Sequence, residues 1–340
     1  MLYGSFTFYG LKRKMRYFHW QLIMTTKRTK SELVSVIVPT LNAAQSLPLL
    51  LAKLKQQTLA PFEFIVIDSA SDDDTVKIAE SQNCKVIEIS QEKFDHSGTR
   101  TLAAQHALGE ILVFLTQDVL LFDEFSIEKL VEPLLKDPEV GAVFGRQIPY
   151  FDASIFAEHL RIFNYPDSSC QRSLDDREKY GLKTVFFSDS FSTYRKTALE
   201  KIGYFRDGLI FGEDTCAAAD MLLKSMKIVY AADAKVFHSH NYSISQEFRR
   251  YFDMGVFHCN ESWLLDKFGK AEGQGIKYVK SELAFLTRKR RFDLLPELVL
   301  RIFAKYLGYK LGRWHKYLPL AINKRFSMNF RWWDRFCSRK

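Results

Sequence analysis

The chain has 340 residues, 47% hydrophobic and 14% aromatic, which suits one large α/β domain with additions or two domains. Its formal net charge is +9, yet residues 33–276 carry 25 Lys and Arg against 35 Asp and Glu, so the basic charge lies at the two ends. An acidic body argues against a nucleic-acid groove on that body. Basic, aromatic-rich ends suit an anionic membrane surface better, with a solvated basic helix face as the alternative.

The five cysteines are scattered and form no C-x-x-C pair, as is typical of a reduced cytosolic protein. No run approaches the roughly 18 consecutive apolar residues that a membrane span requires. Basic residues at positions 13, 14 and 16 interrupt the first apolar stretch, so we expect no signal peptide. We expect residues 1–23 to be an upstream extension or a misassigned start before Met24, and residues 1–32 to form a basic extension outside the fold.

From residue 33 onward, strand-like and helix-like segments alternate, which predicts a mostly parallel sheet flanked by helices. Pro39 is expected to end the first strand. Neither G-x-G-x-x-G nor G-x-x-x-x-G-K-[ST] occurs, which removes the main support for a dinucleotide or P-loop site. The pattern predicts strands at 33–38, 62–67, 85–89, 111–115 and 140–144, and helices at 47–54, 71–80, 99–108 and 213–226.

The strand at 111–115 runs into Thr116, Gln117 and Asp118. Ligands of open α/β sheets bind at the carboxyl ends of the strands, so Asp118 is well placed to hold a metal ion. The alternative for an isolated Asp at this position is a turn or a helix cap.

Two sets of segments resemble known motifs. The first set resembles the ordered motifs of family 2 glycosyltransferases with the GT-A fold: 35–42 (SVIVPTLN), 65–72 (IVIDSASD), 115–118 (LTQD) and 212–214 (GED). The second set resembles the bacterial rhamnosyltransferases that build surface polysaccharides: 94–100 (FDHSGTR), 145–149 (GRQIP), 163–166 (FNYP), 238–242 (HSHNY) and 250–255 (RYFDMG). The resemblance covers about residues 33–263.

The resemblance implies a site for a nucleotide-sugar donor. Asp68 resembles the acid that holds the base or ribose, with an Asx turn as its alternative role. Arg100 would face the nucleotide or its diphosphate. A cation at a helix start is unfavourable in the field of the helix dipole, and residues that break such local rules are often found at functional sites. The donor-binding residues implied are Pro39, Thr40, Asn42, Asp68, Ser69, Arg100, Gln117 and Asp118.

The resemblance also implies a divalent cation, Mg²⁺ or Mn²⁺. Asp118 matches the last residue of the family's D-x-D motif, whereas the earlier acidic position is replaced. With one carboxylate, the protein is expected to bind the metal weakly until the donor arrives, because diphosphate and water would supply most ligands. His238, or else His240, would complete the metal site. A zinc site with Cys259 has no recognised spacing.

For catalysis, an inverting transfer needs a carboxylate to accept the proton of the attacking hydroxyl. The resemblance implies Asp214 as this base and Glu213 as its support; the alternative is a pair of acids that stabilises the helix dipole. We expect the helix terminus to lower the pKa of Asp214. On the acceptor side the resemblance implies Arg146, Gln147, Asn164 and Tyr165. Arg250 either contacts a lipid-linked diphosphate or lies on a solvated helix face.

Together, these features predict a GT-A domain over residues 33–270 and a helical, basic and aromatic membrane-associating region over 271–340. The implied reaction moves L-rhamnose from dTDP-L-rhamnose to a polyprenyl-diphosphate-linked saccharide, at the inner face of the bacterial plasma membrane. Alternatives are transfer of another hexose from a UDP- or GDP-sugar, and a non-catalytic sugar-nucleotide or membrane-binding module. Nucleic-acid binding through the basic tail is a third alternative, but no nucleic-acid partner is expected.

Overall fold

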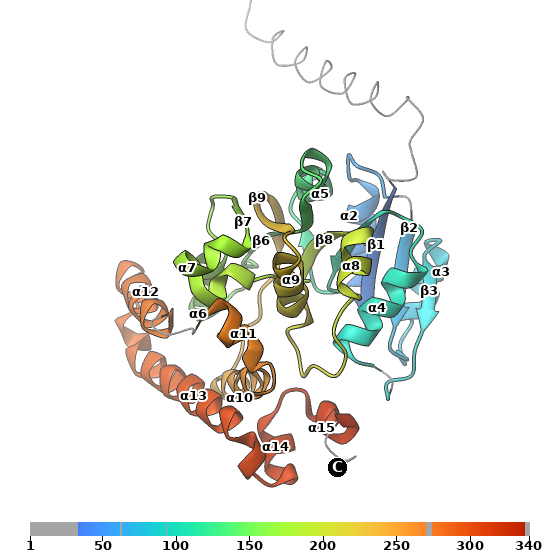
Figure 1. Ribbon diagram of the computed structural model, residues 1–340. Helices are drawn as coiled ribbons and strands as arrows, with labels where there is room; N and C mark the ends of the chain where they lie inside the picture. Colours follow the sequence, from blue (N-terminus) through green and yellow to red (C-terminus); the bar gives the residue numbers. More distant parts are fainter. Residues whose placement is uncertain (1–32, 62, 93, 270–273, 337–340) are drawn as a thin grey trace, which may run out of the picture.

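The computed structural model describes residues 33–61, 63–92, 94–269 and 274–336, so the expected extension at 1–32 lies outside the described residues. In this part of the chain nine strands form one sheet, in the order β3-β2-β1-β4-β8-β6-β9-β5 with β7 beside β9 (Figure 1). The parallel half consists of β1 (Val34–Thr40), β2 (Glu63–Asp68), β3 (Lys85–Glu88) and β4 (Ile111–Leu115). The mixed half consists of β5 (Leu120–Leu121), β6 (Val140–Ile148), β7 (Cys170–Arg172), β8 (Phe191–Arg195) and β9 (Lys227–Phe237).

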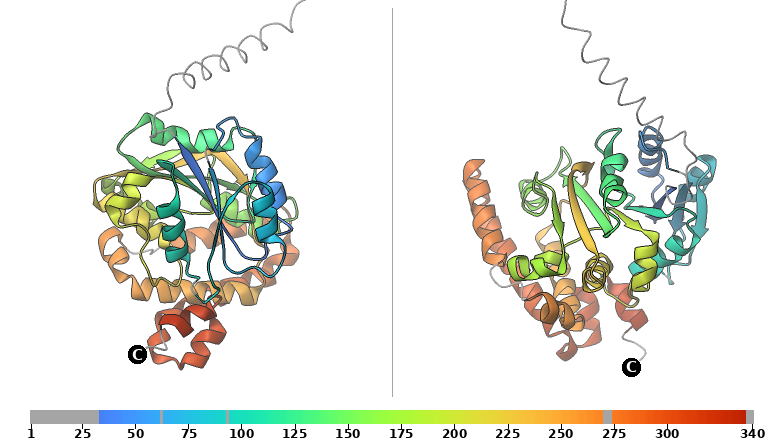
Figure 2. Two further views of the ribbon diagram at one scale, coloured as in Figure 1. Left: turned by 90° about the vertical axis from the view of Figure 1, so that its right-hand side faces the viewer. Right: turned by 45° about the horizontal axis from the view of Figure 1, so that its top comes forward.

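Helices cover both faces of the sheet, which explains the nearly continuous apolar runs of its central strands (Figures 1 and 2). Within β1, Ile37 belongs to the core on one face, while Val36 and Val38 belong to the core on the other. One face packs against α2 (Leu47–Lys55), α3 (Thr75–Ser81) and α5 (Ser126–Lys136). The other packs against α4 (His96–His106), α8 (Lys196–Ile202) and α9 (Glu213–Leu223). The expected α/β architecture is confirmed.

Two local expectations are wrong. Pro39 does not end the first strand, because β1 continues to Thr40 and Pro39 pairs with Ile67 of β2. Its missing N–H is tolerated there since the pairing of β1 with β4 already stops at Ile37. Helix α4 begins before residue 99, because the side chain of Asp95 accepts hydrogen bonds from the amides of Ser97 and Gly98 and so caps the helix.

A layer of further helices lies to the left of the sheet and below it in Figure 1 and includes the helices expected beyond residue 270. No helix of the described residues is long and apolar enough to cross a membrane. Trp333 of the last helix is buried in the larger core, so this layer is packed onto the body. The helices are α6 (Ile155–Asn164), α7 (Arg177–Tyr180), α10 (Ile244–Asn260), α11 (Ser262–Phe268), α12 (Gln274–Arg288), α13 (Leu295–Arg313), α14 (Leu320–Phe326) and α15 (Phe330–Phe336).

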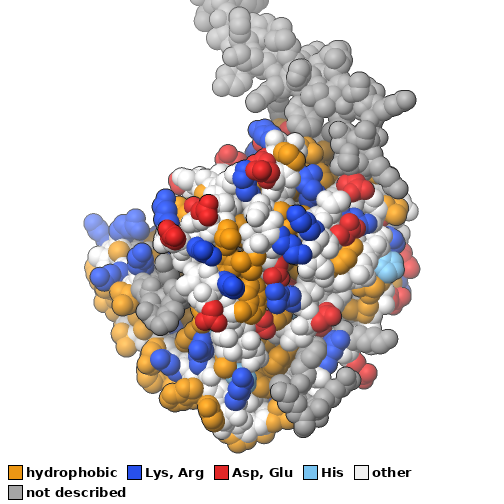
Figure 3. Space-filling model, viewed as in Figure 1, with side chains coloured by type: hydrophobic (Ala, Val, Ile, Leu, Met, Phe, Trp, Pro, Cys, Tyr) orange, Lys and Arg blue, Asp and Glu red, His pale blue; other side chains and the backbone are white. Residues whose placement is uncertain are grey.

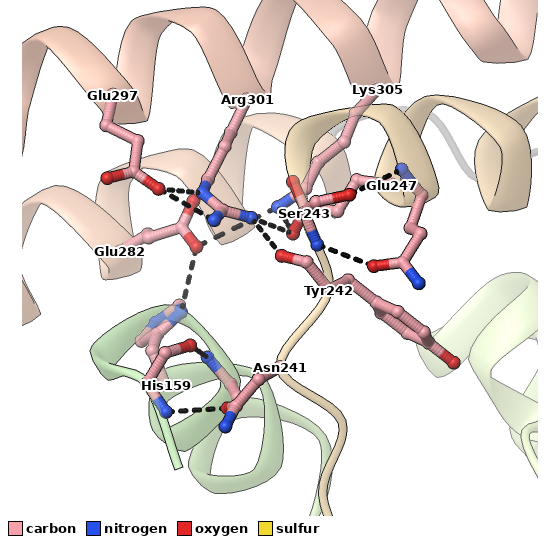
Figure 4. Close-up of polar contacts among 12 residues, drawn as sticks. His159, Asn241, Tyr242, Ser243, Glu247, Glu282, Glu297, Arg301 and Lys305 are labelled. Atoms are coloured by element: carbon pink, nitrogen blue, oxygen red, sulfur yellow. Dashed lines mark hydrogen bonds and ion pairs between the residues drawn. The ribbon is translucent and has the colours of Figure 1, made fainter.

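Buried charges join four of these helices (Figure 4). Glu247 of α10 lies 3.1 Å from Arg301 and 3.5 Å from Lys305, both of α13. Glu282 of α12 lies 3.8 Å from Lys305 and 3.7 Å from His159 of α6. Removing one partner of such a pair leaves a buried charge uncompensated, so these contacts define how the helices dock.

Helices α10 and α13 also approach each other through glycines. A Cβ atom at Gly312 would lie 2.0 Å from the carbonyl oxygen of Phe252. We therefore expect Gly312→Ala to destabilise the protein by about 1–3 kcal/mol, because backbone would have to move. Gly275→Ala in α12 is the matched control, since nothing lies within 4 Å of its Cβ position. Thermal unfolding of both variants is the measurement, and equal Tm values would contradict the close contact.

Candidate active site

The carboxyl ends of β1 and β2 lie side by side, as expected for the donor site. The Thr40 hydroxyl donates to Asp68 Oδ1 at 2.8 Å, and both the amide and the hydroxyl of Ser71 donate to the same carboxylate. Asp68 is fully buried, so its charge organises the turn that follows β2. Ser69 is also buried, and its hydroxyl has no hydrogen-bond partner among the described residues.

Two further donor-site residues connect loops to one another. Asn42 adopts a left-handed backbone (φ 51°) and its Oδ1 accepts from the amide of Asp72. Gln117 binds both backbone groups of Leu41: its Oε1 accepts from the Leu41 amide at 2.8 Å, and its Nε2 donates to the Leu41 carbonyl at 3.0 Å. The loop after β1 is thereby fixed to the residue next to Asp118.

Asp118, His238 and His240 form a compact group just beyond the ends of β4 and β9. Asp118 Oδ2 lies 3.2 Å from His238 Nε2 and 3.6 Å from His240 Nε2. One ligand atom from each residue lies within 4.8 Å of the others. Among the described residues, no group of this kind includes Cys259. Burial would raise the pKa of Asp118, but the neighbouring side chains of His238, Thr116 and His240 together outweigh this effect and hold the pKa well below its usual range.

His238 has the arrangement expected of a metal-binding histidine. It is buried, and burial lowers its pKa, so the imidazole is neutral and able to bind a cation. Its Nδ1 lies 2.8 Å from Gln147 Oε1, an oxygen that also accepts from Arg161, while Gln147 Nε2 donates to the Ser188 hydroxyl. Since Gln147 Oε1 can only accept, the His238 proton lies on Nδ1 and the Nε2 lone pair faces Asp118. The three side chains fit a divalent cation.

Gln147 was expected on the acceptor side, but the structure places it in the interior, where its amide orients His238. We expect Gln147→Ala to weaken the affinity of the site for a divalent cation about 10–100-fold, as loss of such supporting hydrogen bonds typically does. The measurement is calorimetric titration with Mn²⁺ as the probe, with Gln105→Ala on the exposed face of α4 as control. An unchanged affinity would show that Gln147 does not support the site.

The candidate base lies in a cluster of acids at the start of α9. Arg100 Nη1 lies 2.9 Å from Glu213 Oε1, and Arg100 Nε lies 3.4 Å from Asp189 Oδ2. The amide of Asp189 donates to Asp214 Oδ2 at 3.2 Å. Because Ser188 holds Gln147 and the next residue holds Asp214, a single segment joins the histidine side of the site to the candidate base.

The expected lowering of the pKa of Asp214 is wrong. Burial, followed by the nearby charges of Glu213 and Asp189, raises the pKa of Asp214 to about 8. These effects outweigh the helix terminus, whose field is modest in comparison. Burial would raise the pKa of Glu213, but Arg100, together with His96 and backbone hydrogen bonds, outweighs this effect and lowers it. Of the two acids, Asp214 is therefore the one suited to accept a proton near neutral pH.

The other expected residues surround this cluster. Arg100 is buried and forms an ion pair with Glu213. Tyr165 is buried and hydrogen-bonds Ser188, while Asn164 ends α6 and is partly exposed. Arg146 is partly exposed, follows an irregularity in β6 and makes no ion pair among the described residues.

From the sequence, no role was assigned to Arg161 or to Asp189. Arg161 contacts Gln147 and, with exposed Arg250, places positive charge near His238 and His240. An arginine within an amphipathic helix carries no signal of such a role. The Asp189 carboxylate accepts from the hydroxyls of Ser192 and Tyr194, which follow it closely in sequence in β8.

Comparisons with known proteins agree with this geometry. The family model described as glycosyl transferase family 2 matches residues 35–203. The O-antigen chain rhamnosyltransferase RfbN of Salmonella typhimurium is 44% identical over 303 residues, which cover 88% of this chain and 96% of that protein. The corresponding protein WbaN of Salmonella anatum is 42% identical over 302 residues, covering 88% and 95%.

Among solved structures, the mannosyltransferase PcManGT from Pyrobaculum calidifontis, in complex with GDP-Man and Mn²⁺, superposes with a TM-score of 0.54 at 18% identity. The match covers 96% of this chain and 94% of that one, and at this identity it supports the fold alone. The expected GT-A fold is confirmed. The chain belongs to glycosyl transferase family 2 and is a glycosyltransferase.

Proposed function

We propose that the chain transfers L-rhamnose from dTDP-L-rhamnose to a lipid-linked saccharide during assembly of an O-antigen-like polysaccharide. The observation that carries this proposal is the group of Asp118, His238 and His240, joined through Ser188 and Asp189 to Asp214. A cation-binding group and a carboxylate base are the two functions that sugar transfer from a nucleotide requires. The rhamnose donor follows from the names of RfbN and WbaN.

Asp118, His238 and His240 would hold the cation, and two imidazoles beside one carboxylate favour Mn²⁺ over Mg²⁺, which prefers oxygen ligands. When bound, the cation acts as a Lewis acid that stabilises charge on the leaving diphosphate. Arg161 and Arg250 add positive charge on the same side. Both histidines, rather than one of the two as expected from the sequence, would then lie beside the single carboxylate.

Asp214 would act as the base. Its carboxylate takes the proton of the acceptor hydroxyl while that oxygen attacks C1 of the sugar from the face opposite the diphosphate, which inverts the configuration. The amides of Asp189 and Thr215 hold the Asp214 carboxylate in place. Glu213 stays ionised against Arg100, and its charge helps to keep the pKa of Asp214 high.

The acceptor is proposed to be a polyprenyl-diphosphate-linked saccharide at the inner face of the plasma membrane. Arg250 supports this proposal because it is exposed and its guanidinium lies 5.8 Å from the centre of the Phe211 ring, close to the start of α9. An exposed cation at that position is available to a diphosphate.

A donor panel tests the proposal. We expect dTDP-L-rhamnose with Mn²⁺ to raise the Tm of the protein more than UDP- or GDP-sugars do, because a ligand that binds only the folded state stabilises it. Asp118→Asn protein is the control for the metal-dependent part of the shift. A larger Tm shift with a UDP- or GDP-sugar would contradict dTDP-L-rhamnose as the donor and identify that sugar nucleotide instead. Binding without any transfer or hydrolysis would favour a non-catalytic module.

A further inference from the structure

Helix α13 exposes most of its large apolar side chains and buries two charged ones, Arg301 and Lys305. Its inner face consists of Leu298, Arg301, Ala304, Lys305, Gly308 and Gly312, all buried against the body. Its outer face carries large apolar side chains that are more than half exposed: Val299 (64%), Leu300 (56%), Phe303 (61%), Tyr306 (60%) and, just past its end, Trp314 (60%). A surface helix of a soluble protein normally has the opposite arrangement.

The inner face shows that this orientation is built into the fold. Gly308 and Gly312 allow α13 to lie against the carbonyl oxygens of Phe248 and Phe252, where any side chain would collide. Arg301 donates to the carbonyl of Tyr242 at 2.9 Å and pairs with Glu247 and Glu297 (Figure 4). Rotating the helix to bury its apolar side would break these ion pairs and bring bulky residues into the glycine contact.

Basic residues border the exposed apolar face. Residues 277–340 contain 17 Lys and Arg against four Asp and Glu. Arg288 and Arg290 are exposed where α12 leads into α13, and Lys310 and Lys316 are exposed at the far end, next to Tyr317 (87% exposed). Figure 3 shows hydrophobic and basic side chains intermixed along the lower left edge of the molecule, where α12 and α13 lie in Figure 1.

We propose that the outer face of α13, formed by Val299, Leu300, Phe303, Tyr306 and Trp314, docks on an anionic lipid bilayer. Its apolar and aromatic side chains enter the boundary between headgroups and acyl chains, and the bordering Lys and Arg bind the headgroups. No described helix spans a membrane, so this contact is interfacial. The proposal rests on the proposed function and deepens it, because it names the surface that brings the active site to a lipid-linked acceptor.

Charge complementarity selects the lipid surface over other partners. A second copy docked on the same face would bring two sets of Lys and Arg together, and like charges repel. Residues 1–32 of this chain carry seven Lys and Arg against one Glu, so they also suit this face poorly. An anionic bilayer offers both the apolar interior and the negative charge.

Co-sedimentation of the full-length protein with vesicles tests the proposal. We expect binding to phosphatidylethanolamine vesicles that contain phosphatidylglycerol, and much weaker binding to neutral phosphatidylcholine vesicles. The Phe303→Ser, Tyr306→Ser double variant should bind the anionic vesicles at least about 10-fold more weakly, because it lacks two aromatic rings that the bilayer would bury. Leu49→Ser is the control, since Leu49 of α2 is equally exposed (53%) but lies away from α13.

Full vesicle binding by the double variant, or equal binding of the wild type to neutral vesicles, would overturn the proposal. A wild-type dimer that dissociates in the double variant, measured by light scattering without vesicles, would assign the face to a second copy instead. The thermal shift with dTDP-L-rhamnose should be the same in wild type and double variant. This separates a failure of membrane docking from a failure of the proposed donor.

Discussion

Asp214→Asn is expected to lower kcat by a factor of about 10²–10⁴, the usual contribution of a general base. The substitution keeps the size of the side chain, and the amide oxygen can still accept one of the two hydrogen bonds that the amides of Asp189 and Thr215 donate to the two carboxylate oxygens. Donor binding and stability should therefore remain, while the proton of the acceptor hydroxyl has no acceptor. The matched control is Asp220→Asn in the same helix, whose carboxylate pairs with Arg206 at the surface.

The pH dependence of Asp214 provides an independent test. A base acts only when ionised, and the pKa of Asp214 is raised to about 8 by burial and by Glu213 and Asp189. Activity should therefore increase with pH and fall as the pH drops through about 8. We expect this decrease in the pH profile of kcat/KM, because kcat/KM reports the pKa values of the free enzyme. Constant kcat/KM between pH 5 and pH 9 would contradict the assignment of Asp214.

Asp118→Asn is expected to have the second large effect, a loss of more than about 100-fold in Mn²⁺-dependent transfer, because it removes the only carboxylate of the metal-binding group. Mn²⁺ titration by calorimetry, with and without dTDP, gives a readout that does not depend on catalysis. His106→Ala is the control, since His106 is exposed at the end of α4. Unchanged Mn²⁺ affinity in Asp118→Asn would exclude this group as the metal site.

The sequence predicted those parts of the site that follow directly from strand ends. Thr40, Asp68 and Asp118 each end or follow a parallel strand, and parallel strands bring their carboxyl ends to one edge. His238 follows β9 in the same way, and its approach to Asp118 agrees with the expected metal-binding group.

Other features depend on contacts between distant segments. Arg100 lies at a helix start in the sequence, but its buried partners come from α9 and from the segment before β8. The same holds for Gln147, whose role depends on His238, Arg161 and Ser188 from three other segments. The pKa of Asp214 could not be predicted either, because it depends first on burial in the folded protein, and then on the charges of Glu213 and of Asp189, which is distant in sequence.

The orientation of helix α13 is the clearest example of a feature that depends on contacts between distant segments. Its amphipathic and basic character is visible in the sequence, but which side faces the body is not. That choice depends on Glu247 and Glu282, which neutralise Arg301 and Lys305 inside the protein, and on the glycine contact with α10. A pattern of apolar positions alone would bury the wrong side.

The most direct test of the central claim is transfer of labelled sugar from dTDP-L-rhamnose, with Mn²⁺, to membranes that carry polyprenyl-diphosphate-linked saccharides. NMR of the product then reports the configuration at C1 of the transferred sugar. We predict that the wild type labels the lipid-linked saccharide with inverted configuration and that Asp214→Asn protein does so at least about 100-fold more slowly. Retained configuration, or equal rates for the two proteins, would contradict Asp214 as the base of an inverting rhamnosyl transfer.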